Sequence, residues 1–255
     1  MVSEQPKVSV VMPAYNMEQY IGEAIRSVQN QTYSNWELLV VDDGSDDSTC
    51  DIVEQIAVVD GRIRLIRNEK NIGVAQTRNR GFELASGEYV ALLDSDDLWR
   101  EEKLERQISL AGETGAGIIY CSYAIIGETG EKVCDDFIVP VITNFEEALS
   151  KIVISCSTAL LSRDVYKKYH FNKDYYHEDL VFWLQILRDR VEVSGVTDVL
   201  ADYRVHNGTR ASNKIRTAIN RWKVYRTYFE LSVVKSAWFF VKYAFLGVKK
   251  YWRKK

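Results

Sequence analysis

YVALLDSDDLW, residues Tyr89–Trp99, is a run of apolar residues that leads directly into three carboxylates within four positions. The apolar part predicts a buried strand over Tyr89–Leu93, and Asp94, Asp96 and Asp97 follow where that strand ends. Carboxylates about 4 Å apart repel each other by roughly 1 kcal/mol in water and by about 4 kcal/mol near a protein surface. Such crowding indicates either a solvated turn with one acid as a helix N-cap or a site for a divalent cation.

The residues before this stretch alternate between short β-branched runs and helical patterns. The expected strands are Val8–Met12 (stopped by Pro13), Trp36–Val41, Arg62–Arg67 and Tyr89–Leu93. The expected helices are Glu18–Gln29, Ser48–Ala57, Gly73–Leu84 and Arg100–Ala111. Strands separated by helices of this length predict right-handed crossovers and an α/β fold, Rossmann-like, with a mostly parallel sheet flanked by helices. Ligands of such sheets bind beyond the carboxyl ends of the strands, where the acidic stretches DDGS and DSDD lie.

The second half of the chain is less regular. Strands are expected at Ile118–Tyr123 and Ser155–Leu161, with one or two more within Val191–Arg204, and a short helix is expected at Asp179–Arg188. From Lys214 to the end the pattern is helical. We therefore predict one α/β domain, residues 1–212, with halves at 1–120 and 121–212, followed by a basic amphipathic helical extension, residues 213–255.

Composition limits the class of protein. The chain has 255 residues, 46% of them apolar and 27% charged, which is an ordinary globular composition. The N-terminal residues show no basic segment followed by an apolar core, so no secretory signal is expected. Its four cysteines have no CxxC spacing, and we expect reduced core residues rather than zinc ligands or disulfides.

Five motifs in order give the sequence a specific family resemblance. They are VSVVMPAYN, NQTYSNWELLVVDDGSDDST, NIGVAQTRNRG, GEYVALLDSDDLW and HEDLVFWLQIL, within residues 6–210. Together they resemble the family 2 glycosyltransferases with the GT-A fold, most of all bacterial enzymes that make capsule, O-antigen or teichuronic-acid type polysaccharides. The resemblance implies an inverting transfer of a sugar from a nucleotide diphosphate donor, a UDP-sugar, to a hydroxyl of a lipid-linked glycan, with Mn²⁺ or Mg²⁺. It also makes residues 1–120 the nucleotide-binding half and residues 121–212 the acceptor half.

The resemblance assigns roles around the donor nucleotide. The positions that match are Pro13, Ala14 and Tyr15 beside the base, Asp42 and Asp43 at the uracil and ribose, Arg78 opposite the donor charge, and Asp94, Ser95 and Asp96 as the DxD motif. Strand alternation points Asp42 and Asp43 to opposite sides, so which of them contacts the base stays open. For Arg78 the structural alternative is an exposed helix arginine.

The resemblance also assigns metal and catalytic roles. Asp96 would reach the ribose or the metal, the metal ligand being Asp96, Asp97 or both, and His206 would complete a carboxylate-rich site suited to Mn²⁺. Asp179, which follows Glu178 at the start of the expected helix, corresponds to the general base of the family. The alternatives are an exposed loop histidine for His206 and an acid that only favours a helix N-terminus for Asp179. Arg204 and Arg210 are weaker candidates for contacts with phosphate.

Two absences narrow the function. There is no GxGxxG after the first strand and no GxxxxGK[ST], so dinucleotide and P-loop interpretations lack their glycines. The QxxRW signature of processive synthases is also absent, which favours one sugar per event. The rival class is a nucleotide-sugar-binding protein on the same fold that is non-catalytic or transfers nucleotidyl groups.

The charge is divided unevenly along the chain. Residues 210–255 carry thirteen lysines and arginines against one acid, whereas the preceding residues are strongly acidic, and we expect no nucleic-acid partner. Leu231–Val248 is apolar but contains Lys235 and Lys242, so it does not match a membrane span. The side chains that would form an interfacial helix are Lys235, Lys242, Lys249 and Arg253 on a stripe, with the rings of Trp238, Phe240, Phe245 and Trp252. We expect residues 231–255 to place the protein on the cytoplasmic face of the membrane; the alternative is that the rings pack on the domain or on a second subunit, as a homo-oligomer.

Overall fold

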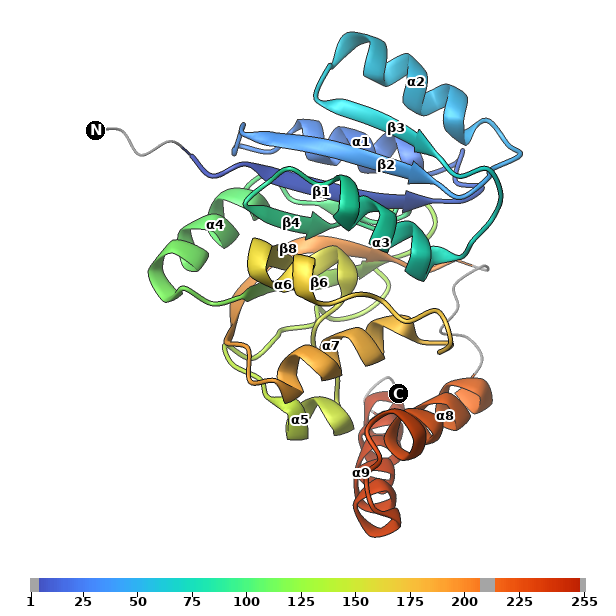
Figure 1. Cartoon of the computed structure of the whole chain (residues 1–255), viewed down its shortest axis with the longest axis vertical. Coiled ribbons are helices and arrows are strands. Elements are labelled where there is room, and N and C mark those ends of the chain that lie inside the picture. The colour runs from blue at the N-terminus through green and yellow to red at the C-terminus, as the bar shows by residue number, and fades with distance from the viewer. Residues whose placement is uncertain (1–4, 207–213, 253–255) are drawn as a thin grey trace.

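The computed structural model describes residues 5–206 and 214–252, and these form one α/β unit around a single mixed sheet (Figure 1). The eight strands of the described residues lie in the order β3-β2-β1-β4-β7-β6-β8-β5. Their bounds are β1 Val8–Ala14, β2 Trp36–Asp42, β3 Ile63–Arg67, β4 Tyr89–Leu92, β5 Leu98–Trp99, β6 Ile118–Ile126, β7 Leu160–Ser162 and β8 Val193–Arg204. The first four in the order are parallel, β7 is antiparallel to both its neighbours, β6 and β8 are parallel, and β5 is antiparallel to β8.

Helices cover both faces of this sheet. Their bounds are α1 Ile21–Gln29, α2 Thr49–Val59, α3 Val74–Leu84, α4 Lys103–Thr114, α5 Phe145–Ser150, α6 Arg163–Lys168, α7 Glu178–Arg188, α8 Lys214–Lys223 and α9 Val233–Trp252, with short turns of helix at η1 Cys156–Thr158 and η3 Val224–Tyr228. One core cluster joins α3, α5, α6 and α7 to the sheet, and a second joins α1, α2 and α4 to its other face. Along β1 the two clusters take alternate residues, Val11 on one side and Val10 and Met12 on the other. The predicted parallel, doubly covered arrangement is confirmed.

Pro13 does not stop the first strand, contrary to the prediction. It lies inside β1, paired in register with Val41 of β2. In a parallel strand successive residues bond to opposite neighbours, and Ala14 bonds to β2 through the amide of Asp43. Pro13 therefore faces β4, which has already ended at Leu92, so its missing N–H leaves no acceptor of β4 unpaired.

The expected strand at Ser155–Leu161 is only partly correct. Cys156–Thr158 forms the helical turn η1, and the strand β7 begins at Leu160. The turn is closed by a reciprocal pair of hydrogen bonds between Ser155 and Thr158, a capping box that competes with an extended backbone.

The C-terminal helices pack on the domain through one face of α9. Phe239 and Phe240 contact the core cluster, and Phe240 meets the ring of Trp222 edge-on at 5.7 Å. Tyr225 of η3 donates a hydrogen bond to the carbonyl of Leu149 at the end of α5. For Phe240 the alternative, packing on the domain, therefore holds in place of the predicted position at the lipid boundary. None of the helices in the described residues is both long enough and apolar enough to cross a bilayer.

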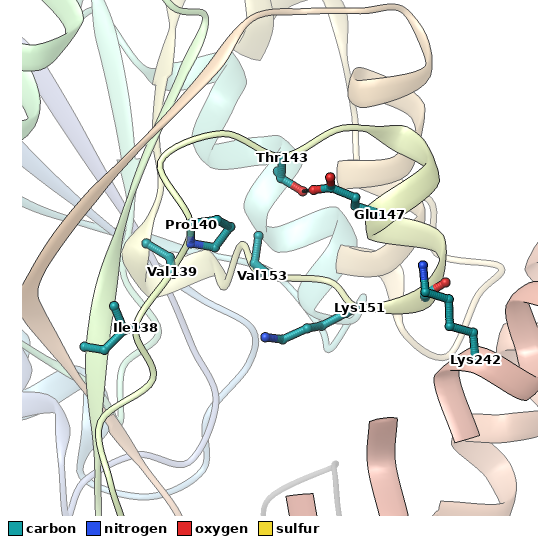
Figure 2. A pocket seen from close by; sticks show the side chains of 9 residues that line it. Ile138, Val139, Pro140, Thr143, Glu147, Lys151, Val153 and Lys242 are labelled. Atoms are coloured by element: carbon teal, nitrogen blue, oxygen red, sulfur yellow. Dashed lines mark hydrogen bonds between the residues drawn. The ribbon is translucent and has the colours of Figure 1, made fainter. Parts of the chain in front are cut away.

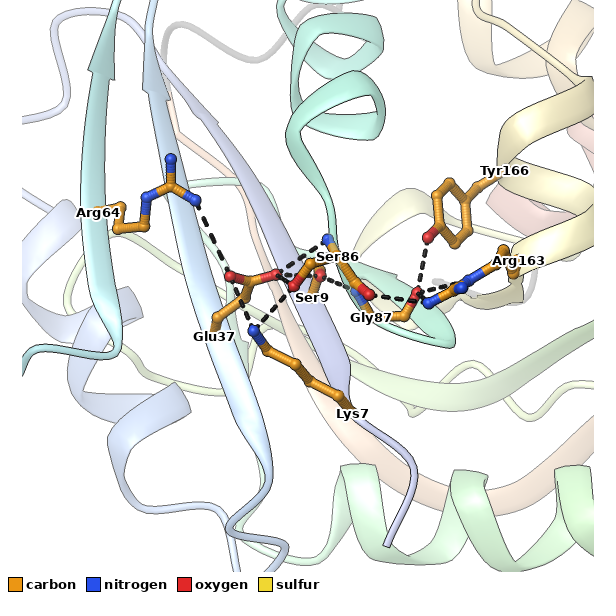
Figure 3. A network of polar contacts seen from close by, with 8 residues as sticks. All are labelled: Lys7, Ser9, Glu37, Arg64, Ser86, Gly87, Arg163 and Tyr166. Carbon is orange, nitrogen blue, oxygen red and sulfur yellow. Dashed lines mark hydrogen bonds and ion pairs between the residues drawn. The ribbon is translucent and has the colours of Figure 1, made fainter. Parts of the chain in front are cut away.

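A buried polar network ties the amino ends of the parallel strands together (Figure 3). Glu37 of β2 accepts hydrogen bonds from the hydroxyls of Ser9 at 2.6 Å and Ser86 at 2.7 Å, and pairs with Lys7 at 3.1 Å. Ser9 in turn accepts from the amide of Gly87, just before β4. Burial alone would raise the pKa of Glu37, but these donors outweigh it and lower the pKa to about 2. The network lies at the opposite ends of the strands from the acidic clusters.

Glu37→Gln should reduce the free energy of unfolding by about 1–3 kcal/mol above pH 5, because buried donors lose their ionised acceptor. The unfolded carboxylate binds its proton near pH 4.5 and the folded one only near pH 2, so the wild-type advantage should shrink as the pH falls through this window. Urea unfolding of the wild type and of Glu37→Gln at pH 6, 4 and 3 measures this difference in the free energy of unfolding. Glu54→Gln, at an exposed glutamate, is the control; a difference for Glu37→Gln that is constant over this range would contradict the assignment.

Candidate active site

The predicted site residues gather at the carboxyl edge of the sheet. Asp42 ends β2, Asp94 follows β4 after one residue, and His206 lies two residues beyond β8. The start of α7 brings Glu178 and Asp179 to the same region, since Glu178 is linked to Asp94 through Arg78. Residues more than a hundred positions apart in the sequence thus meet at one site.

Arg78 joins the two halves of this site. It lies on α3, is only 5% exposed, and pairs with Asp94 at 2.6 Å and with Glu178 at 2.8 Å. Its guanidinium also lies 5.1 Å from the centre of the Phe171 ring. Burial would lower the pKa of Arg78, but the neighbouring carboxylates raise it well above its usual value. The alternative of an exposed helix arginine is therefore wrong.

Asp96 and His206 form a second pair. Nε2 of His206 lies 3.0 Å from Oδ2 of Asp96, and the imidazole packs on the ring of Tyr20 at 5.2 Å. Both side chains are largely shielded from water. The pKa of Asp96 is raised, mainly by burial and secondly by the charge of Asp94. The hydrogen bond and charge of His206 lower it, but by less. The alternative of an exposed loop histidine does not hold for His206.

Asp97 is engaged by the protein itself. It is 1% exposed, and its two carboxylate oxygens accept hydrogen bonds from the Ser157 hydroxyl at 2.5 Å and from the Arg204 amide at 2.8 Å. Burial and the charges of Asp96 and Asp94 raise its pKa well above the usual range. Ser157, whose hydroxyl also accepts from the Asp94 amide, was missed from the sequence because a serine in a short polar run gives no signal of a partner sixty residues away.

Arg204 does not have the role considered for it. Its guanidinium is buried and donates to Glu23 at 2.8 Å, to the carbonyl of Asp96 at 2.8 Å and to the carbonyl of Glu128 at 2.7 Å. A phosphate contact would require breaking these bonds. Arg210 lies outside the described residues.

Glu178 and Asp179 differ in burial and in the partners of their carboxylate oxygens. Glu178 is buried against Arg78, whereas Asp179 is half-buried, and its Oδ1 accepts a hydrogen bond from the amide of Leu180 at 2.8 Å. Within residues 5–206 and 214–252, Oδ2 of Asp179 has no hydrogen-bond partner. Of the two acids, Asp179 therefore has an oxygen available for a proton.

Asp42 and Asp43 are both buried and both shape loops. Asp42 accepts from the amides of Gly44 and Ser45 at 3.1 Å each, which closes the turn where Gly44 takes a φ of 80°. Asp43 accepts from the side chain of Asn68 at 2.8 Å, and from the amides of Ile72 at 2.9 Å and Gly73 at 2.8 Å. Asp43 thus fixes the loop that begins α3.

The other predicted donor residues differ in exposure. Pro13 and Ala14 are buried within β1, and Ser95 is buried in the turn after β4. Tyr15, the next residue after β1, is exposed at the carboxyl edge. Tyr15 is therefore the member of this group whose side chain is accessible from solvent.

One pocket borders this site, and another lies away from it. One, of about 590 Å³, borders Glu178 and lies between the start of α3, the loop before α7 and the face of α8. The other, of about 500 Å³, lies between the segment 138–140 and α5, and its lining includes Lys151 and, from α9, Lys242 (Figure 2). None of the predicted site residues lines this second pocket.

Comparison with known proteins places the chain among sugar-transferring enzymes. The family model described as Glycosyl transferase family 2 matches residues 9–170. The putative teichuronic acid biosynthesis glycosyltransferase TuaG of Bacillus subtilis is 36% identical over 251 residues, which cover 98% of this chain and 99% of that protein. The UDP-Glc:alpha-D-GlcNAc-diphosphoundecaprenol beta-1,3-glucosyltransferase WfgD of Escherichia coli is 35% identical, covering 96% and 94%.

Solved structures share the fold. S. aureus TarS 1-349 in complex with UDP-GlcNAc superposes with a TM-score of 0.72 at 21% identity, covering 93% of this chain and 71% of that one. The mannosyltransferase PcManGT from Pyrobaculum calidifontis, in complex with GDP-Man and Mn²⁺, gives a TM-score of 0.72 at 18% identity, covering 96% and 70%. At these identities the likeness extends to the fold alone.

Proposed function

The chain belongs to glycosyl transferase family 2, and on that premise we propose that it moves a sugar from a UDP-sugar to a hydroxyl of a glycan carried on a polyprenyl diphosphate, during synthesis of a cell-surface polysaccharide. Relatives named for UDP-Glc and for a diphosphoundecaprenol-linked acceptor support the donor and acceptor classes. The observation that carries the proposal is Arg78, whose two ion pairs hold the donor motif at Asp94 against the start of α7. One sugar is added per event.

The donor would lie along the carboxyl edge of the sheet. Tyr15 would cover the base beside Pro13 and Ala14, and the loops fixed by Asp42 and Asp43 would enclose the uracil and ribose. Asp94, Ser95 and Arg78 would border the nucleotide through the turn after β4. These roles follow from the family pattern and from the position of each residue at this edge.

The donor atoms of Asp96 and His206 fit a divalent cation. A carboxylate oxygen and an imidazole nitrogen 3.0 Å apart suit Mn²⁺, and a carboxylate with raised pKa gains from a nearby positive charge. In the part of the chain that the structure describes, no group of three His, Cys, Asp or Glu is ready to hold a metal, so oxygens of the donor diphosphate would supply further ligands. Asp97 is the second carboxylate considered, but Ser157 and Arg204 already occupy its oxygens, which favours Asp96. When bound, Mn²⁺ or Mg²⁺ neutralises the departing diphosphate.

Asp96→Asn should weaken the metal-assisted binding of UDP by about 100-fold or more, because even the partners of metal ligands account for 10–100-fold in affinity. Calorimetric titration of UDP with Mn²⁺, and then with EDTA, measures the effect. Asp198→Asn, at an exposed aspartate paired with Arg106, is the control. Full turnover of the wild type in EDTA would sink the metal assignment.

Asp179 is proposed as the general base. Its fixed Oδ1 orients the carboxylate, and its available Oδ2 takes the proton of the acceptor hydroxyl. The hydroxyl oxygen then forms a bond to the anomeric carbon as the bond to the diphosphate breaks on the opposite face, which inverts that centre. Glu178, held by Arg78, positions the helix that carries the base.

Asp179→Asn should lower turnover by about 10²–10⁴-fold while UDP still binds, because the amide cannot accept the proton. Asp164→Asn is the matched control, since Asp164 occupies the first turn of α6 as Asp179 does that of α7. Transfer to a GlcNAc-diphosphate lipid, with the anomer determined by NMR, is the assay. An unchanged rate or a retained anomer would rule out this role.

The exposed face of α9 is proposed to contact the membrane. Val234, Trp238, Val241 and Phe245 are spaced by four, three and four residues and are each between 65% and 79% exposed. They lie opposite the face formed by Ser236, Phe240 and Tyr243, and Lys235 and Lys242 flank them. An apolar stripe beside lysines, in a segment with thirteen basic residues and one acid, suits an anionic bilayer surface.

Replacing Val234, Trp238, Val241 and Phe245 together by serine should lower partitioning to anionic vesicles by at least about tenfold, because large apolar side chains leave the lipid. Vesicle sedimentation measures partitioning, and Val58→Ser/Val59→Ser, at exposed valines of α2, is the control. Absence of vesicle binding by the wild type, with a dimer that the serine variant dissociates, would instead make the stripe a subunit interface.

A further inference from the structure

The pocket beside Glu178 carries a second cluster of polar groups that the proposed chemistry does not use. Its walls include the first residues of α3, the loop Lys173–Tyr176, and Arg216, Asn220 and Lys223 of α8. We propose that this pocket binds the diphosphate through which the acceptor glycan is joined to its lipid carrier. The inference rests on the proposed function and names the place where the acceptor is recognised.

The charge of the pocket suits an anion. Lys173, Arg216 and Lys223 line it, against two acids, Asp174 and Glu178, and the charge of Glu178 is already compensated by Arg78. Two of the cations lie against rings: Arg216 is 4.0 Å from the centre of Tyr176, and Lys223 is 4.9 Å from that of Tyr175. Cations held on aromatic faces lose less freedom when they bind a ligand.

Backbone donors add to this charge. Val74 and Ala75, in the first turn of α3, line the pocket, and the N-cap residue of the helix is Gly73, which offers no capping side chain. First-turn amides lack acceptors within their own helix and carry the positive end of its dipole. The amides of Ile72 and Gly73 already bind Asp43, so the following amides are the ones that remain for a ligand.

A second, independent observation is a buried hydrogen-bond donor of Asn220 that has no acceptor among the described residues. Asn220 is 6% exposed, and its Oδ1 accepts from the amide of Tyr176 at 3.0 Å, which ties α8 to the loop before α7. Its Nδ2 has no hydrogen-bond partner in residues 5–206 and 214–252. A buried amide donor without an acceptor is costly, and a phosphate oxygen entering between Asn220 and the neighbouring lysines would satisfy it.

The position of the pocket distinguishes acceptor from donor. Tyr15, Asp96 and His206, proposed for the nucleotide and its diphosphate, do not line it, and the loop fixed by Asp43, proposed beside the uracil and ribose, forms only one wall of it, at Ile72 and Gly73. Glu178, the neighbour of the proposed base, does. An acceptor whose hydroxyl reaches Asp179 would therefore extend its diphosphate into this pocket, and about 590 Å³ is within the usual range for small ligands. The lipid would leave along α8 toward α9, which carries the exposed apolar stripe.

The test compares two acceptors in detergent: a GlcNAc-diphosphate with a short prenyl chain, and a neutral alkyl glycoside of GlcNAc. Lys173→Gln/Lys223→Gln should lower the preference of the enzyme for the diphosphate acceptor, measured as the ratio of the two kcat/KM values, by about tenfold. The loss should lie in the KM of the diphosphate acceptor. Both lysines are exposed, so folding should survive; Asn220→Asp, which sets a carboxylate against the anion, should lower the same ratio further.

Lys132→Gln/Lys168→Gln, which removes two exposed charges that do not line the pocket, is the matched control and should leave the ratio as in the wild type. An equal fall in the control would assign the effect to the general charge of the protein and overturn the inference. A parallel fall in UDP affinity in Lys173→Gln/Lys223→Gln would assign the pocket to the donor and overturn it as well. A wild type that uses neither acceptor and does not bind UDP would instead count against the proposed function.

Discussion

A buried arginine that needs two carboxylates is the constraint on which the site depends. Arg78 is removed from water on α3, and a guanidinium in that position is tolerated only with its charge compensated. Its partners, Asp94 beyond β4 and Glu178 at the start of α7, come from the two halves of the domain. The ion pairs therefore fix the distance between the donor motif and the proposed base. An arginine serves better than a lysine here, because its planar fork can donate to two acids at once.

The sheet and its order of elements were largely predictable, because a short hydrophobic run bounded by turn residues indicates a buried strand. Prediction failed where tertiary contacts outweigh local pattern. Pro13 continues β1 only because β4 has already ended beside it, and Cys156–Thr158 is helical because Ser155 and Thr158 cap each other. β5 is a two-residue strand that exists through its pairing with β8, and two residues carry too little pattern to be found. Phe240 and Trp238 are close in sequence but differ in exposure. Only one side of α9 packs on the domain, and Phe240 lies on that side whereas Trp238 is exposed.

For the site, motif order identified which residues meet, but no sequence pattern shows what holds each of them. Asp42 and Asp43 were expected to contact the nucleotide, and the structure shows that Asp42 accepts hydrogen bonds from its own loop and Asp43 from the loop that begins α3. Arg204 was considered for phosphate, yet its guanidinium closes a contact with Glu23, 181 residues away. Such partners depend on the folded arrangement of loops. The contacts of Ser157 and Asn220 could not be predicted for the same reason, and neither residue belongs to a motif.

The crowding of carboxylates after β4 is resolved by a different partner for each acid. Asp94 is neutralised by Arg78, and Asp97 is held by Ser157 and the amide of Arg204, where burial raises its pKa. Among the described residues, the side chain of Asp96 pairs with His206, an imidazole that is a full cation only when protonated. The fold thus compensates two of the three acids from within and leaves the third beside a nitrogen ligand at the carboxyl edge of the sheet. In the proposed function, a cation arriving with a diphosphate would complete this arrangement at Asp96, because its carboxylate, unlike that of Asp94, forms no ion pair with an arginine in the part of the chain that the structure describes.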